Sequence, residues 1–311
     1  MDSQTSQKLP AIDFTNINLA NRELVKSQVY QALVEYGCFE ATFDKIPLHL
    51  RKAMFDAIQE LFDLPLEIKT LDACKMNHQG YVGQTPVIPL FESLGIDHAN
   101  IFQRVDTITN TWWPQGNPSF SKTINSFSVK LAELDETIRK MVLESLGVEK
   151  YIEEHMKSTD YLLRVMKYKS PQTNDKKLGL VPHTDQTLVT ILYQNQVGGL
   201  EVMTKDEKWI SFKPSSPHSF LVLVGDSFKA WSNGRLHSPF HRVMMSGNET
   251  RYSLGLFTLP KKGCIVNAPD ELVDEEHPLL FKPYDFVEFL NYRYSEEGFR
   301  DPFSLRTYCG V

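Results

Sequence analysis

The feature that most constrains the fold is a change in hydrophobic pattern near residue 160. From there on, short runs rich in β-branched and aromatic residues alternate with turn sequences such as NQVGG, TKDEK and SGNE. Eight such runs occupy about a hundred residues: YLLRVMKY, LVTILYQN, GLEVMT, WISFKP, SFLVLVGD, HRVMMSG, RYSLGLFTLP and CIVNAP. Strands this short and this closely spaced predict an antiparallel sandwich or jelly roll.

Helical patterns flank this β region. Apolar residues recur every three or four positions in residues 21–37, 49–62 and 119–147, so we expect three helices there. Residues 70–118 are less regular and are expected to form loops and short strands, with Trp112 and Trp113 in the core. The stretch PYDFVEFLNYRYSEEG near the end of the chain is again typical of a helix.

Bulk properties exclude several classes of protein. The 311-residue chain carries a net charge of -6, and its Lys and Arg residues are scattered, so no nucleic-acid or acidic-membrane partner is indicated. It contains neither a secretory signal nor a run of about 18 apolar residues. The four cysteines are far apart and are expected to be free thiols in a reducing compartment. We therefore expect a cytoplasmic protein, and nothing in the sequence demands more than a monomer.

The stretch VPHTDQTLVTILYQ contains a candidate metal-binding pair. If it forms a strand, His183 and Asp185 point to the same face because side chains alternate with period two. Their Cα atoms would lie roughly 6.6 Å apart at about 3.3 Å per residue, so both side chains can approach one ion. By itself an H-x-D triplet is weak evidence, since it is also a common turn sequence.

A third ligand is available in NGRLHSPFHRV, where two histidines lie four residues apart. Pro239 between His237 and His241 argues against a helix, and an extended chain would separate them by roughly 13 Å. At most one of them is therefore a ligand. Both have the same parity on a strand, so alternation does not choose; the strand-like pattern HRVMM favours His241.

Two histidines and one carboxylate are the facial set of non-haem iron(II) oxygenases, although zinc in a hydrolase is an alternative for the same three groups. Ten residues after His241, Arg251 and Ser253 share a strand face. A guanidinium and a hydroxyl in this position can hold one carboxylate, because arginine binds carboxylates in a bidentate manner.

These motifs together resemble the plant 2-oxoglutarate- and iron(II)-dependent dioxygenases. The resemblance rests on His183-x-Asp185, His241 and Arg251-x-Ser253, and on LPAIDF, EYGCFEA, LFDLPLEIK and Gly80-Tyr81 in the first half of the chain. NGRLHSPFHRV is similar to the family signature in which the histidine before Arg-Val binds iron, so the resemblance selects His241 over His237.

The resemblance implies Fe(2+), 2-oxoglutarate and dioxygen as cofactor and cosubstrates, with Arg251 and Ser253 on 2-oxoglutarate. Tyr168 falls where the family has a tyrosine that also helps to bind 2-oxoglutarate, but Met166 and Lys167 replace the family's Asn and Tyr just before it. Further residues implied for the substrate pocket are Phe257, Tyr81 and Phe102. Residues 75–110 and the C-terminal helix are expected to form a lid over that pocket.

The implied fold is a mainly β core with flanking helices, a double-stranded β-helix (jelly roll) with an N-terminal mixed helical region and a C-terminal helix. We expect one compact unit divided as follows: an N-terminal dioxygenase region at 8–115, a framework helix at 119–147, the iron- and 2-oxoglutarate-binding core at 158–262, and a helical tail at 263–311.

The tail PDELVDEEHPLLFKPYD and the ending TYCGV are most similar to the AOP-type subgroup, whose members oxidise specialised metabolites. Enzymes of this kind include deoxypodophyllotoxin synthase and glycoalkaloid hydroxylases. We therefore expect hydroxylation, desaturation or oxidative ring closure of a plant specialised metabolite, with release of succinate and carbon dioxide. Two alternatives remain at this point: a non-catalytic jelly-roll binding protein, and a zinc hydrolase with the same His/Asp/His triad.

Overall fold

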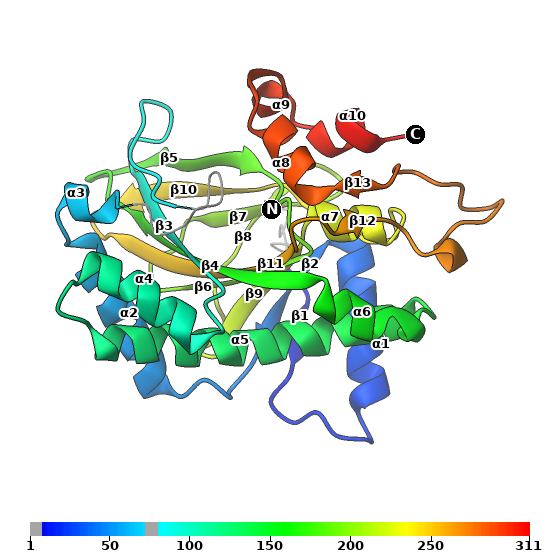
Figure 1. Cartoon of the computed structure of the whole chain (residues 1–311), viewed down its shortest axis with the longest axis horizontal. Coiled ribbons are helices and arrows are strands. Elements are labelled where there is room, and N and C mark those ends of the chain that lie inside the picture. Colours follow the sequence, from blue (N-terminus) through cyan, green and yellow to red (C-terminus); the bar gives the residue numbers. More distant parts are fainter. Residues whose placement is uncertain (1–7, 72–79) are drawn as a thin grey trace, which may run out of the picture.

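The computed structural model describes residues 8–71 and 80–311, and within them two β-sheets face each other with helices around them (Figure 1). Apolar side chains of both sheets fill the space between the sheets. Met166, Tyr168 and Leu223 come from the larger sheet, and Val202 and Val243 from the smaller one. The predicted jelly roll with flanking helices is therefore confirmed.

Among the described residues the larger sheet has seven strands in the order β1-β2-β9-β6-β11-β4-β3. Neighbouring strands are antiparallel except for the parallel pair β1 and β2. The strands are β1 (Ala11–Asp13), β2 (Cys38–Thr42), β9 (Ser219–Val224), β6 (Val189–Gln194), β11 (Arg251–Pro260), β4 (Thr159–Tyr168) and β3 (Phe91–Asp97).

The smaller sheet has the order β5-β10-β7-β8, with strands β5 (Thr173–His183), β10 (His241–Gly247), β7 (Leu200–Met203) and β8 (Trp209–Ser211). A separate pair joins β12 (Ile265–Val266) to β13 (Tyr284–Asp285). Each of the eight predicted runs contains a strand. Strand β5 was not predicted, because much of its sequence, TNDKKLGLVPH, is polar and four consecutive residues of it are exposed.

The long helix α5 (Pro118–Ser145) lies against the outer face of the larger sheet (Figure 1). Asn117 caps its first turn, and the predicted stripe through Ile124, Phe127 and Leu131 is buried. The other helices are α1 (Arg22–Glu35), α2 (Leu48–Phe62), α3 (Leu66–Lys69), α4 (Phe102–Trp112), α6 (Ile152–Lys157), α7 (Asp226–Trp231), α8 (Phe286–Arg293), α9 (Glu296–Arg300) and α10 (Ser304–Cys309), with 3-10 turns at Glu149–Tyr151 and Asp270–Leu272.

Helix α4 corrects one expectation, since its region was predicted to contain only loops and short strands. Val105, Ile108 and Trp112 are buried at helical spacing and pack into the same core as α5. The polar residues between them weaken the apolar pattern in the sequence, and tertiary packing stabilises the helix. Trp112 is a core residue, as expected. In the described part of the chain, no helix is long and apolar enough to cross a membrane.

The cysteines of the described segments, Cys38, Cys264 and Cys309, are free thiols. Burial raises the pKa of Cys38 and of Cys309 to about 12, so both stay protonated and unreactive at neutral pH. Cys74 lies outside the described residues.

Candidate metal centre and cosubstrate site

The three predicted metal ligands meet at one end of the smaller sheet. His183 is the last residue of β5, His241 is the first residue of β10, and the two are paired in antiparallel register. The prediction that Asp185 and His183 share a strand face is wrong, because β5 ends at His183. Asp185 lies in the following turn, where its backbone oxygen accepts a hydrogen bond from the Asp226 N–H at 2.7 Å.

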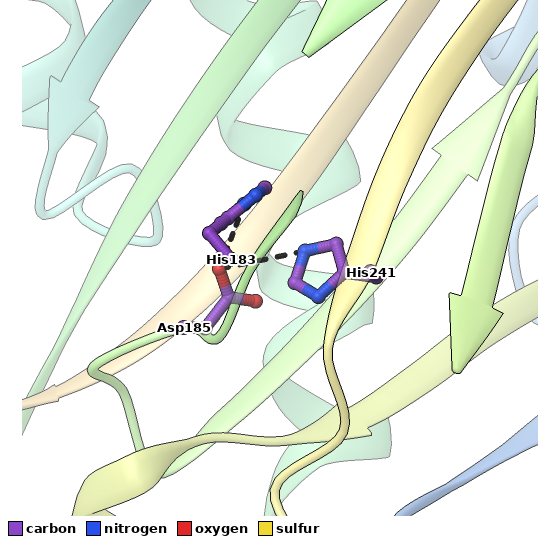
Figure 2. Close-up of side chains that lie close together, drawn as sticks. All are labelled: His183, Asp185 and His241. Atoms are coloured by element: carbon purple, nitrogen blue, oxygen red, sulfur yellow. Dashed lines mark ion pairs between the residues drawn. The ribbon is translucent and has the colours of Figure 1, made fainter. Parts of the chain in front are cut away.

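The ligand atoms converge on one point (Figure 2). Asp185 Oδ1 lies 3.8 Å from His183 Nε2 and 3.7 Å from His241 Nε2, and the two imidazole centroids are 4.2 Å apart. In the described segments this is the one group of three or more His, Cys, Asp or Glu side chains that could hold a metal ion, with its ligand atoms all within 4.8 Å of one another. Two imidazoles and a carboxylate form the facial donor set that suits iron(II).

Hydrogen bonds orient two of the ligands. His183 Nδ1 lies 2.8 Å from the Val181 carbonyl oxygen, which can only accept, so the proton is on Nδ1 and the Nε2 lone pair is available to a metal. Thr190 Oγ1 donates to Asp185 Oδ2 at 2.7 Å, which leaves Oδ1 directed at the histidines. The backbone and a threonine thus set the ligand geometry before any metal binds.

Electrostatics also prepare the site for a cation. Burial, followed by the charge of His241, lowers the pKa of His183 to about 4, so His183 is neutral at physiological pH. A neutral imidazole is the form that binds metals. His241 is 6% exposed, and its Nδ1 has no hydrogen-bond partner in the described part of the protein.

Arg251 is a buried cation that has no acidic partner among the described residues. Its Nη1 donates to Ser253 Oγ and its Nη2 to Gln194 Oε1, both at 2.9 Å, while its Nε is unpaired in the same set of residues. Burial lowers the pKa of Arg251, which shows how unfavourable this environment is for an isolated charge. A ligand carboxylate would restore the missing counter-charge.

Tyr168, which was predicted to help bind 2-oxoglutarate, lies beside Arg251. The two residues are paired in register between β4 and β11, and the guanidinium carbon is 4.9 Å from the centre of the Tyr168 ring. The Tyr168 hydroxyl donates a weak hydrogen bond, 3.7 Å long, to Met166 Sδ. Met166 thus gives the tyrosine a soft acceptor at the position where the family has an asparagine.

Strand β6 connects the two parts of the site. Thr190, which holds Asp185, and Gln194, which holds Arg251, lie on the same face of β6 and four residues apart. Their Cα atoms are therefore roughly 13 Å apart at about 3.3 Å per residue. A five-carbon dicarboxylic acid can extend from a metal at one end of this gap to a guanidinium at the other.

The three predicted substrate-pocket residues lie in different surroundings. Phe257 is on β11, on the same strand face as Arg251 and Ser253, and also packs against an apolar cluster that includes Phe286 and Phe289 of α8. The Tyr81 hydroxyl donates to Glu92, which pairs with the buried Lys69, and burial raises the pKa of Tyr81 to about 12. Phe102 begins α4 and is 38% exposed. Part of the predicted lid, residues 75–79, lies outside the described residues.

Sequence reasoning missed four residues of this site. Thr190 and Gln194 have the same parity in LVTILYQN, and two polar residues on one face of an otherwise apolar strand were the available signal. Arg164 has the same parity on β4 as Tyr168, and it donates to Ser93 Oγ at 2.8 Å. Tyr294, at the end of α8, has a pKa that is raised by burial and by the charge of Asp185, against the opposing charges of Arg164 and Arg293. Nothing in the sequence connected Tyr294 to the metal ligands.

His237 does not join the metal centre. Its backbone N–H donates to the Leu33 carbonyl at 3.1 Å, which ties the segment before β10 to helix α1. Gly37, just beyond that helix, has φ +69°, and a Cβ there would lie 2.2 Å from the His237 carbonyl oxygen. The backbone at His237 is thus part of a close approach between two segments, in agreement with a structural role.

A jelly roll with an inward-facing His/Asp/His triad and a buried arginine further along its interior defines the class of iron(II)- and 2-oxoglutarate-dependent oxygenases. Comparison with known proteins agrees with this class. Residues 159–260 match the 2OG-Fe(II) oxygenase superfamily, and residues 9–88 match the family described as non-haem dioxygenase in morphine synthesis N-terminal.

The similar proteins cover nearly all of the chain. The probable 2-oxoglutarate-dependent dioxygenase AOP1.2 of Arabidopsis thaliana is 50% identical over 303 residues, which are 94% of this chain and 93% of the relative. A dioxygenase for auxin oxidation from rice has a TM-score of 0.83 at 29% identity and covers 98% of this chain and 100% of its own. JOX2, solved in complex with 2OG, Fe and JA, has a TM-score of 0.77 at 25% identity, covering 97% and 90%.

The chain belongs to the plant 2-oxoglutarate- and iron(II)-dependent dioxygenases of the AOP type. It is an oxidoreductase that uses iron(II) and 2-oxoglutarate, and His183, Asp185 and His241 form its facial triad.

Proposed function

We propose that this dioxygenase oxidises a plant specialised metabolite by hydroxylation, desaturation or oxidative ring closure, releasing succinate and carbon dioxide. The observation that carries the proposal is Arg251, a buried guanidinium without an acidic partner in the described structure, in the same interior as the triad. Membership of the AOP type supports a small-molecule substrate of this kind.

The chain's own residues would bind and orient the cosubstrate. Arg251 and Ser253 bind the distal carboxylate of 2-oxoglutarate, Gln194 holds the guanidinium in place, and Tyr168 packs against it. Iron(II) bound with 2-oxoglutarate activates dioxygen and supplies the oxidising power. The apolar residues between the sheets keep water away from this region.

The substrate is proposed to bind on the side of the triad where the end of α8 approaches. Burial raises the pKa of Tyr294 at the end of α8, the charges of Arg164 and Arg293 lower it, and the charge of Asp185 raises it, which supports a position of this phenol near the metal ligand. Phe257, Tyr81 and Phe102 stay as predicted pocket residues. Their surroundings differ, and we expect Phe257, which shares a strand face with the cosubstrate residues, to affect substrate binding most.

Two other functions compete for the same triad. A zinc hydrolase would have no use for a buried arginine that binds a carboxylate, and a non-catalytic binding protein would not need the triad together with Arg251 and Ser253. We also propose that the protein acts in the cytosol as a monomer, and that residues 8–115, 119–147, 158–262 and 263–311 work as one unit. The free thiols of the described chain support a reducing compartment.

The test is an oxygen-consumption and succinate assay with iron(II) and 2-oxoglutarate, with and without a plant metabolite extract. Mass spectrometry of the extract distinguishes the reaction types: hydroxylation adds one oxygen, whereas desaturation and ring closure remove two hydrogens. We expect succinate in proportion to a mass-shifted metabolite. Hydrolysis products formed with zinc and without 2-oxoglutarate would contradict the proposal.

A further inference from the structure

A cavity of about 410 Å³ lies outside the metal centre, between α6, the end of α7 and the segment that contains β12. Leu188, Trp231 and Val266 form apolar walls, and His155 of α6 contributes a polar group. The volume is within the range of small-molecule sites. None of the three metal ligands or the residues that hold Arg251 lines this cavity.

His155 is the feature that the proposed function leaves unexplained. It is 4% exposed, and neither of its ring nitrogens hydrogen-bonds to another residue within the described segments; its Nε2 is fully enclosed. Its ring packs against Trp231 at 4.7 Å and Phe228 at 5.5 Å. A buried polar side chain without partners costs free energy unless a ligand or water completes its hydrogen bonds.

The charge of the surroundings limits what can bind. Burial, and then the charge of Arg139, lowers the pKa of His155 well below its usual range, so the imidazole is neutral and offers one donor and one acceptor. The charged residues that line the cavity are Glu154 and Asp270, both acidic. An anion would be repelled there, whereas an uncharged ring compound can pack against Trp231 and hydrogen-bond to Nδ1 of His155, the ring nitrogen that is not enclosed.

We propose that this cavity is a second small-molecule site, and that it binds an uncharged aromatic compound bearing a hydroxyl or N–H group through His155 and Trp231. The site goes beyond the proposed oxidation and does not depend on it.

The cavity is separate from the metal centre but adjacent to the segment that holds Asp185. Leu188 follows Asp185 by three residues and lines the cavity. Helix α7 has Asp226 at one end, donating its N–H to the Asp185 backbone at 2.7 Å, and Trp231 at the other end, in the cavity wall. A compound in this cavity would therefore contact Leu188 and Trp231, which lie in the two segments that position Asp185.

The experiment uses three naphthalene probes that differ in one group. 2-Naphthol, naphthalene and 2-naphthoate are titrated into the full-length protein by calorimetry, with saturating 2-oxoglutarate and Mn(II) present to occupy the metal centre without turnover. We expect 2-naphthol to bind the most tightly and 2-naphthoate the least. In His155→Phe, which keeps a flat ring, 2-naphthol should bind about fivefold to tenfold more weakly, whereas naphthalene binding should not change.

Two further variants make the result decisive. His49→Phe places the same substitution on an exposed face of α2 and should bind all three probes like the wild type. Cys264→Phe fills the cavity from its lining without touching His155, and should abolish binding of all three probes. The proposal is overturned if 2-naphthol binds His155→Phe as tightly as the wild type. It is equally overturned if the wild type binds none of the probes, in which case His155 is completed by water alone.

Discussion

Arg139 and Arg251 are both almost completely buried, and their surroundings are opposite. Arg139 of α5 is 1% exposed and donates to Asp135 at 2.8 Å and to the Tyr161 hydroxyl at 3.2 Å. Arg251 of β11 is 2% exposed and donates to a serine and a glutamine. One buried cation has its counter-charge within the chain, and the other has only neutral acceptors in the described residues.

The pKa shifts of the two arginines have opposite directions. Burial disfavours the charge of Arg139, but Asp135 and Tyr161 outweigh that cost and raise its pKa. Burial lowers the pKa of Arg251, and the nearby Tyr168 does not compensate for it. Asp135 is itself fully engaged, because Tyr161 and Thr258 donate to its two oxygens. These differences support the proposal that Arg251 binds a ligand carboxylate, whereas Arg139 has its counter-charge within the fold.

The largest effect on activity is expected at the metal ligands. His183→Ala, Asp185→Ala or His241→Ala should reduce succinate formation to background, because each removes one donor from the one three-ligand cluster found in the described segments. The matched control is His237→Ala, four residues before His241, which should keep iron binding and cosubstrate turnover. Full activity of His241→Ala would refute the assignment of the triad.

The next largest effect tests the structural arginine. Arg139→Met leaves Asp135 as a buried charge without its partner, and we expect a loss of about 3–5 kcal/mol in the free energy of unfolding. Urea unfolding measures this change. Lys140→Met, which removes an exposed ion pair of the same helix with Glu136, should change stability by less than about 1 kcal/mol. Equal losses in the two variants would remove the distinction between the arginines.

Arg251→Met should have the opposite profile. Because the guanidinium has no counter-charge in the described chain, its removal should leave the stability of the ligand-free protein unchanged or slightly higher. The KM for 2-oxoglutarate should rise about tenfold to a hundredfold, as expected for the loss of charge-assisted hydrogen bonds. A strongly destabilised variant with an unchanged KM would show that Arg251, like Arg139, is structural.

The smallest effect concerns His237 and pH. Burial, and then Lys205 and Lys229, lowers the pKa of His237 to about 4, whereas the unfolded chain has a value near 6.5. The unfolded state therefore binds more protons between these values, and stability is lost as pH falls from about 6.5 to about 4. His237→Gln should lose less stability than the wild type between pH 7 and pH 5 in urea unfolding of the metal-free protein. An identical pH dependence would mean that His237 does not contribute to it.

Much of the fold was predictable because the strands of the core are apolar and their turns are polar. The eight strand runs and the stripe of α5 follow directly from this pattern. Strand β5 and helix α4 were missed, since their polar residues hide a periodicity that tertiary packing stabilises.

The site was predictable in its residues more than in its geometry. His183, Asp185 and His241 could be selected from motifs, but the turn that positions Asp185 depends on a hydrogen bond from Asp226, 41 residues away. Gln194 could not be assigned to Arg251 without the register of β6 and β11. Long-range pairing of this kind has no local signature in a single sequence.

The most direct test of the central claim is the binding of 2-oxoglutarate to the iron(II) protein, titrated by calorimetry without oxygen. We expect one cosubstrate per chain, bound about tenfold to a hundredfold more weakly by Arg251→Gln and unchanged by Arg104→Gln, a substitution at an exposed position of α4. Unchanged binding by Arg251→Gln would contradict the proposal that this buried cation binds the cosubstrate.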